Sequence, residues 1–501
     1  MTVQKQRYDD VSPWEPDDGC IPDRYLNDVH DLFDTWSAVR ARNSGLTRYY
    51  EMKNAAKNLG AEIPPQLRDV NAVVGWCAKA VDVRAVRSRF DGFVFDGGQS
   101  DPTLDEIARR NGLSMKVAAA TRSALVHGVS MMSVMRGRAE KGQPPAVIRA
   151  FSANQACVLW DKDADDVACG LALTGVDRFG TPNGYVAHFP DSVLTFRRYG
   201  SSWTCIEEYN PAGRPLIVAI RNRPDLDKPL GHSVITPELM SITDKAVRDV
   251  IRMDIGAEFF TFPQRYALGV ADDLFGADYD EEGNPIDEDA VDEDGNPVKR
   301  PVDEAKKLKA WLGSIWAITR DENGDVPQVG QFPAGDAGNF VAVYENDAQR
   351  FSGASNVPLA QLGVLSNNYT SSDALGAAND PLILDVQEFN DCAATSLETV
   401  ARLAMAVAGD GTLSALTPAQ NRVRAYFDDP SMPTLPARAD AWTKLGSLDK
   451  DIVGTDVWYE GMGLQHATIE RLNSQKRERG AIAALNAMMA PSGQVGGADG
   501  R

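Results

Sequence analysis

The sequence has few of the residues from which compact active sites and metal sites are built. Its 501 residues include six cysteines and five histidines, and no two cysteines form a Cys-x-x-Cys pair. This spacing argues against a zinc site and against a disulfide framework. The chain also contains no G-x-S-x-G, H-E-x-x-H or P-loop pattern. We therefore expect no catalytic residue, no cofactor and no metal, and a chain that is not an enzyme.

Long apolar runs and an excess of positive charge are also missing. No stretch reaches the roughly 18 apolar residues that cross a bilayer, so we expect no membrane contact. Lysine and arginine number 51 against 71 acidic residues, which gives a formal net charge of −20. That balance argues against a broad basic surface that grips nucleic acid. It remains compatible with a protein past which nucleic acid moves without sticking.

What is present is a series of helical patterns interrupted by one β-rich block. Such a length exceeds what one compact core usually holds, and 43% hydrophobic with 24% charged residues is ordinary for a folded protein. Residues 145–235 contain short β-rich runs between turn residues, which predict an antiparallel sheet inserted among helices. The fold class predicted is therefore α+β. Apolar residues mark one face of the first helix: Leu26, Val29, Leu32, Phe33 and Trp36.

A long helix is predicted from Thr236, which precedes Pro237, to the residues before Pro263. Its apolar side carries Leu239, Ile242, Ala246, Met253 and Ala257. A basic line follows another side: Lys245, Arg248 and Arg252. This line has two interpretations. It is an ion-paired solvent face that uses acids of the same helix, or it faces a polyanion.

Two acidic segments could suggest cation binding. Asp161, Asp163 and Asp165 lie between two β-rich runs, where a charged hairpin turn is the simpler interpretation. The insert at residues 272–304 repeats "DEEGNP" as "DEDGNP", but proline falls where a calcium-binding EF-hand loop requires glycine. We interpret this insert as a solvated acidic loop.

Five stretches occur in a characteristic order: "YYEMKNAAKNLGAEIPPQL" with "VVGWCAKAVDVRAVRSRFDGFVF", "DEIARRNGLSMKVAAATRSALVHGVSMMSV", "GHSVITPELMSITDKAVRDVIRMDIGAEFFTFPQRYALGV", "SNNYTSSDALGAANDPLILDVQEFNDCAATSLETVARLA", and "RADAWTKL" with "GMGLQHATIERLNSQKRE". With these stretches the chain resembles the portal proteins of tailed bacteriophages, of the siphophage type that forms a head–tail connector ring. Cys77 and His127 depart from residues common in that family, which are a proline and an aromatic.

The resemblance implies a portal fold with a wing, a two-helix stem, a clip and a helical C-terminal crown. The implied divisions are a flexible arm at 1–24, the wing at 25–235 with its β-rich insert at 145–235, a descending stem helix at 236–262, a clip at 263–333 with the acidic insert at 272–304, a returning stem helix at 334–352, a tunnel loop at 353–372, a long kinked helix and wing strand at 373–430, crown helices at 431–490 and a flexible tail at 491–501. Pro381 is expected to produce the kink.

The resemblance also implies a structural role. A ring of about twelve copies would occupy one vertex of the capsid in the virion, after synthesis in the host cytoplasm. Double-stranded DNA would pass through its channel, without sequence specificity, during genome packaging and ejection. The ring would contact the terminase motor, the head–tail adaptor protein, and the major capsid and scaffolding proteins.

The implied channel residues are Asn367, Asn368 and Tyr369 of the tunnel loop, together with Lys245, Arg248 and Arg252. The two asparagines could instead simply form the turn before a helix cap. A different class of function also stays open at this stage. It is a metal-dependent enzyme that uses the Asp161, Asp163 and Asp165 carboxylates.

Overall fold

The computed structural model describes residues 15–53, 72–95, 101–261, 265–268, 278–279, 285–286, 328–331, 338–364, 376–409, 411–431, 435–464, 468–469 and 471–479. The chain forms two compact units, Met1–Phe427 and Asp428–Arg501. Helices and antiparallel sheets are both present, so the predicted α+β class is confirmed. None of the helices in these ranges is long and apolar enough to cross a membrane.

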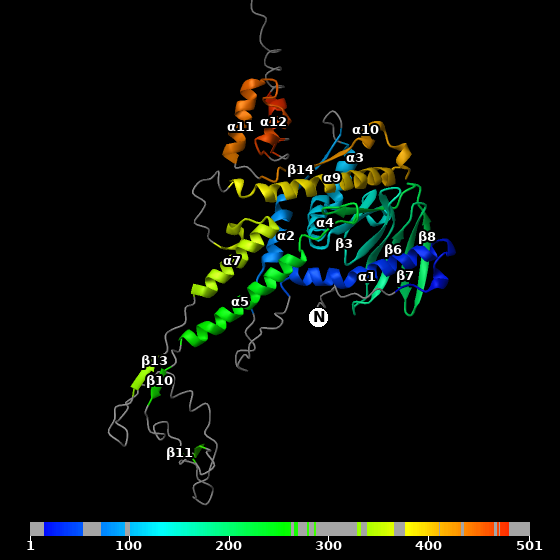
Figure 1. Cartoon of the computed structure of the whole chain (residues 1–501). Coiled ribbons are helices and arrows are strands. Elements are labelled where there is room, and N and C mark those ends of the chain that lie inside the picture. The colour runs from blue at the N-terminus through cyan, green and yellow to red at the C-terminus, as the bar shows by residue number, and fades with distance from the viewer. Residues whose placement is uncertain are drawn as a thin grey trace, which may run out of the picture. The chain divides into compact units, whose positions relative to one another are not determined.

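The first unit contains most of the helices and, among the described residues, all the strands (Figure 1). Its helices are α1 (Leu26–Tyr50), α2 (Trp76–Arg87), α3 (Pro102–Asn111), α4 (Leu113–His127), α5 (Pro237–Thr261), α7 (Gly338–Ser355), α9 (Asp380–Ala408) and α10 (Pro418–Asn421). Its longer strands are β1 (Phe90–Val94), β2 (Val129–Arg136), β3 (Ala146–Ser152), β4 (Ala156–Asp161), β5 (Asp166–Val176), β6 (Pro182–His188), β7 (Ser192–Tyr199), β8 (Ser202–Tyr209), β9 (Ile217–Arg221) and β14 (Arg424–Phe427).

The β-rich block forms two sheets, so the expectation of a single sheet was wrong. One sheet has the strand order β3-β2-β9 and the other β4-β5-β6-β7-β8. The division arises because β2, which follows α4, takes β3 on one side and β9 on the other. The chain then turns at residues 153–155 and starts the second sheet with β4. Antiparallel pairing holds throughout both sheets.

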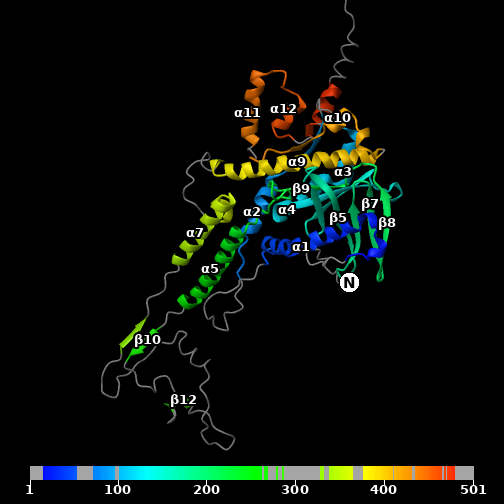
Figure 2. The same cartoon turned by 45° about the vertical axis from the view of Figure 1, so that its right-hand side comes forward.

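Each sheet is covered by helices. Helices α4 and α9 pack on the three-stranded sheet, and α1 packs on β4 and β5 of the larger sheet. The buried face of α1 includes Val29, Leu32, Phe33 and Trp36, as predicted. The two cartoons show α9 running along the top of this unit and α1 beside the five-stranded sheet (Figures 1 and 2).

The helix ends follow the local sequence. The Asp101 carboxylate accepts hydrogen bonds from the Thr103 and Leu104 amides at the start of α3. Helix α4 ends at Gly128, whose φ of 97° favours glycine. The Thr236 hydroxyl accepts a bond from the Leu239 amide at 3.3 Å, which confirms the predicted start of α5.

Pro381 does not act as predicted. Helix α9 begins at Asp380, so Pro381 lies in its first turn. A proline is tolerated there because its missing N–H would have no partner in the helix. Pro381 therefore helps to start α9 and does not kink its interior.

Three short strand pairs complete the first unit. Strand β1 pairs with β14, which lies far along the sequence. Strand β10 (Arg265–Leu268) pairs with β13 (Gln328–Gln331), and β11 (Asp278–Tyr279) pairs with β12 (Pro285–Ile286). Most of the acidic insert lies outside the described residues.

The second unit contains α11 (Leu435–Leu448) and α12 (Asp456–Gly461). The Thr455 hydroxyl caps α12 by accepting a bond from the Trp458 amide. The Trp458 indole donates to the Trp442 carbonyl at 3.3 Å and so joins the two helices.

Candidate functional site

Helices α5 and α7 form an antiparallel pair that carries the predicted basic line. They pack closely along their length, and β10, shortly after α5, pairs with β13, shortly before α7. Figures 1 and 2 both show the two helices side by side, with the β10–β13 pair beyond their far ends. Leu239, Ile242 and Ala246 of α5 are buried, as predicted. Met253 is only half-buried and Ala257 is exposed, while Ile251 is buried in their place.

The basic line is largely an ion-paired surface. The Lys245 ammonium lies 2.6 Å from a carboxylate oxygen of Asp347 on α7, and the Arg350 guanidinium lies 3.9 Å from the same oxygen. The Arg252 guanidinium lies 3.0 Å from Asp249. Arg248 is half-buried. The ion-paired interpretation is therefore confirmed for Lys245 and Arg252, although Lys245 finds its acid on a different helix.

Asp347 is a site residue that the sequence analysis missed. Its side chain is 0% exposed, and that of Asp249 is 5% exposed. The second carboxylate oxygen of each is buried without a hydrogen-bond partner. The sequence hint to its burial is that Asp347 lies directly before Ala348 and near Phe351, apolar residues which are fully buried in the structure. The pairing itself needed knowledge of which helices touch.

The other predicted channel residues, Asn367, Asn368 and Tyr369, lie outside the described residues. The ends of their segment are held by polar contacts. Asn379 accepts bonds from Gln361 and Arg87 at 3.4 and 3.5 Å.

A buried ion cluster joins α2, α9 and the end of α7. The Arg84 guanidinium donates to the Asp385 carboxylate at 2.6 Å and to the Ser355 carbonyl at 2.5 Å. Arg223 and Asn356 also donate to Asp385, at 2.5 and 3.1 Å. Arg223 and Asn356 both have a positive backbone φ, 48° and 55°, a conformation that costs free energy for residues other than glycine. The cluster fixes the direction in which α7 leaves the core.

The carboxylates considered for metal binding form a hairpin turn. Asp161 ends β4 and lies opposite Asp166, the first residue of β5. The Asp161 side chain accepts bonds from the Asp163 and Ala164 amides at 2.8 and 3.2 Å. The turn interpretation is therefore confirmed. No group of three potential metal ligands occurs among the residues for which the structure gives positions.

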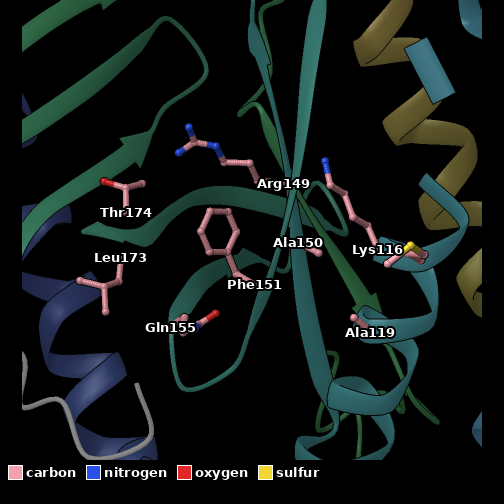
Figure 3. Close-up of a pocket in the computed structure, with 9 residues that line it drawn as sticks. Lys116, Ala119, Arg149, Ala150, Phe151, Gln155, Leu173 and Thr174 are labelled. Atoms are coloured by element: carbon pink, nitrogen blue, oxygen red, sulfur yellow. The ribbon is translucent and has the colours of Figure 1, made fainter. Parts of the chain in front are cut away.

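An open pocket of about 560 Å³ lies between α4, β3 and β5 (Figure 3). Lys116 and Arg149 line it beside Phe151 and Thr174. The Lys116 ammonium donates to the Ile148 carbonyl at 2.5 Å and to the Asn111 side chain at 3.3 Å. Burial lowers the pKa of Lys116, and the nearby Arg149 lowers it further.

Two histidines and the cysteines are held in their neutral forms. Burial lowers the pKa of His127 to about 4 and that of His188 to about 3. His127 contacts Thr47 and Ser123, whereas both ring nitrogens of His188 lack a hydrogen-bond partner. Burial also raises the pKa of the Cys77 thiol to about 11, and Cys77 contacts Thr243 of α5. All six cysteines are free.

Comparison with known proteins gives relatives that extend along most of the chain. No family model matches. The chain is 25% identical over 469 residues to the portal protein of Mycobacterium phage D29, which covers 89% of this chain and 88% of the relative. It is 24% identical over 444 residues to the portal protein of Mycobacterium phage L5, with 87% and 85% covered.

Solved structures give more distant matches. A chain in the neck of a native GTA particle, computed with C12 symmetry, has 13% identity and a TM-score of 0.39, covering 78% of this chain and 90% of that one. A chain in the neck of an empty GTA particle, computed with C6 symmetry, has 13% identity and a TM-score of 0.37, covering 84% and 93%. From the two mycobacteriophage relatives, the resemblance to portal proteins of tailed bacteriophages that the sequence predicts is confirmed.

Proposed function

We propose that this chain is a structural portal subunit, which forms a ring at one capsid vertex and surrounds a channel for double-stranded DNA. One observation carries the proposal. Two proteins named as portal proteins align with nearly the whole chain, and the chain covers nearly the whole of each. Packaging and ejection of the genome, and the docking of a terminase motor and a head–tail adaptor, are part of the proposal. So is a place at the portal vertex of the virion, in contact with capsid and scaffolding proteins.

The arrangement of α5 and α7 supports the proposed stem and clip. The chain leaves the core along α5, forms the β10–β13 pair, and returns along α7. This matches a descending helix at 236–262, a clip at 263–333 and a returning helix at 334–352. In this proposal the sheets with α1 to α4 form the wing, and the second unit belongs to the crown.

The electrostatics fit a channel that does not retain DNA. A net charge of −20 on every copy gives an assembly that repels phosphates over most of its surface. Lys245 and Arg252 each have an acidic partner, so their charges are partly compensated. We propose that Lys245, Arg248 and Arg252 lie near the channel as a weakly basic band. In the same proposal Asn367, Asn368 and Tyr369 provide a neutral constriction.

The first experiment tests the assembly. The purified chain is measured by size-exclusion chromatography with light scattering and imaged by electron microscopy. We expect ring-shaped particles with the mass of about twelve copies. A stable monomer with metal-dependent hydrolysis that is lost on Asp161→Asn would contradict the proposal and favour the enzyme.

The second experiment tests the channel. Asn367→Lys with Asn368→Lys adds two cations per copy, so the ring should hold phosphates as they pass. We expect assembled heads that package DNA, or eject it, more slowly than the parent. The matched control is Asn367→Gln with Asn368→Gln, which keeps the loop neutral. If the parent and the lysine variant package and eject DNA at equal rates, these residues do not line the channel.

A further inference from the structure

Two cationic side chains, Lys116 and Arg149, line the pocket in Figure 3. Lys116 is bonded to neutral oxygens, and within the described part of the chain neither residue forms an ion pair. Phe151 and Met115 add apolar surface, and Met115 is 81% exposed. In a chain with 71 acidic residues, such a pocket suits an acidic segment that also carries an apolar side chain.

A segment of that kind follows β9. Residues 224–229 read Pro-Asp-Leu-Asp-Lys-Pro, and Leu226 at the tip is 99% exposed. Asp227 is also exposed and makes no ion pair within the described part of the chain. The tip therefore presents a leucine next to an uncompensated carboxylate.

The tip is held in shape by its own hydrogen bonds. The Asp225 carboxylate accepts a bond from the Lys228 amide at 2.6 Å and contacts the His232 ring at 2.6 Å. The Arg221 guanidinium donates to the Pro229 carbonyl at 3.2 Å. A fixed loop loses little conformational entropy when it binds, so the exposed leucine is presented ready for contact.

The pocket and the tip lie at opposite edges of one sheet. The three-stranded sheet has the order β3-β2-β9, with pocket residues Arg149 and Phe151 on β3 and the tip following β9. The tip lies beyond the end of β9 at Arg221, whereas Phe151 lies level with Ala219 in the middle of that strand. A head-to-tail ring needs two different, complementary surfaces on each copy.

We propose that the tip formed by Asp225, Leu226 and Asp227 of one copy docks in the Lys116–Arg149 pocket of the next copy. Leu226 packs against Phe151 and Met115, and the Asp227 carboxylate pairs with the Arg149 guanidinium. This contact rests on the proposed ring and assigns two of the surfaces that hold it together.

Charge exchange tests the contact in the full-length chain. Arg149→Glu and Asp227→Arg each place like charges together, so each should shift the population from rings to smaller species. The double variant, Arg149→Glu with Asp227→Arg, restores opposite charges and should restore rings. Arg136→Glu and Asp163→Arg are matched controls at exposed positions outside both surfaces. If both single variants form rings at the parent's concentration, or if the double variant fails to restore rings that the single variants lost, the contact is wrong.

A peptide measurement tests the pocket without relying on the ring. A labelled peptide of residues 223–230 is titrated by fluorescence anisotropy into the Asp227→Arg variant, whose own tip is disabled. We expect saturable binding, weakened about tenfold when the peptide carries Leu226→Ala or the protein also carries Arg149→Glu. Thermal unfolding of every variant checks that its fold is intact. If the parent forms no ring, the proposed function is wrong, and the peptide measurement alone tests whether the pocket binds the tip. If the peptide also fails to bind, both the proposed function and the proposed contact are wrong.

Discussion

The sheet-and-α1 region and the α5–α7 pair are stabilised in different ways. In the first, aromatic rings form the core. The Trp36 and Tyr185 rings meet edge to face with centroids 5.9 Å apart, and Phe33 meets Tyr185 at 5.1 Å. In the second, the buried Asp347 of α7 pairs with Lys245 of α5, and Val341 and Val343 of α7 remain 48% and 41% exposed.

The difference shows which part is complete in a single copy. Apolar burial needs no partner outside the region, so the aromatic core stabilises the sheet on its own. A buried carboxylate is stable only while its cation stays in place. Exposed apolar side chains do not separate the two regions, because Phe179 and Tyr209 of the sheet-and-α1 region are uncovered as well. Four measurements can break or sharpen this contrast.

The largest effect is expected in the aromatic core. Trp36→Ala removes a fully buried ring and leaves a cavity, which should lower the free energy of unfolding by about 4 kcal/mol. Urea unfolding followed by circular dichroism measures this. Phe179→Ala, at a ring that is largely exposed, is the control and should change stability by less than about 0.5 kcal/mol. A loss below about 1 kcal/mol for Trp36→Ala would show that this core is not tightly packed.

A smaller effect is expected between α5 and α7. Lys245→Met leaves the Asp347 carboxylate buried without its nearest cation, and should cost about 2 kcal/mol, because Lys245 itself is partly exposed. Adding Asp347→Leu should recover most of that loss, since the buried charge is then gone. Lys444→Met breaks an exposed pair with Asp440 and should cost about 0.5 kcal/mol or less. If the double variant is no more stable than Lys245→Met, the carboxylate is not the cause.

Acid should destabilise the sheet region through His188, a buried imidazole whose two ring nitrogens have no hydrogen-bond partner among the described residues. The folded-state pKa of about 3 lies below the usual 6.5. Between these two pH values His188 is protonated in the unfolded chain but neutral in the folded chain. Stability therefore falls as the pH drops from about 6.5 towards 3, by up to about 1.4 kcal/mol per pH unit.

Thermal unfolding measured from pH 7 to pH 4 tests this contribution. His188→Leu should make the thermal stability depend less steeply on pH. His127, whose pKa is about 4, should account for part of the pH dependence that remains. An unchanged slope in His188→Leu would place the acid sensitivity elsewhere.

The smallest effect is expected for a single helix cap outside both regions, and it provides a reference value for the contribution of one local interaction to stability. Asp101→Ala removes the acceptor for two amides at the start of α3 and a contact with Gln420, and should cost about 1 kcal/mol. Asp105→Ala, in the same first turn but without a capping role, should cost only a few tenths. Equal losses for the two variants would mean that charge near the helix end, rather than the cap, is responsible.

Much of the local structure could be predicted from the sequence. The run "AVIRAFS" is β3 residue for residue, and Asp101, Thr236 and Gly128 mark helix ends where their chemistry places them. The prediction of a kink at Pro381 was wrong because a proline is equally compatible with a first turn, and the neighbouring residues do not separate the two cases.

The sequence by itself determined the strands, the helix starts and the buried face of α1, because alternation, capping and helical spacing act between near neighbours. Only the tertiary structure decided that the β-rich block forms two sheets, that β1 pairs with β14, and that Lys245 meets Asp347. These choices join residues far apart in the chain, and each depends on which surfaces the whole fold brings into contact. The periodicity of apolar residues in the sequence shows that one face of a helix or strand is apolar, but it does not show which element that face packs against.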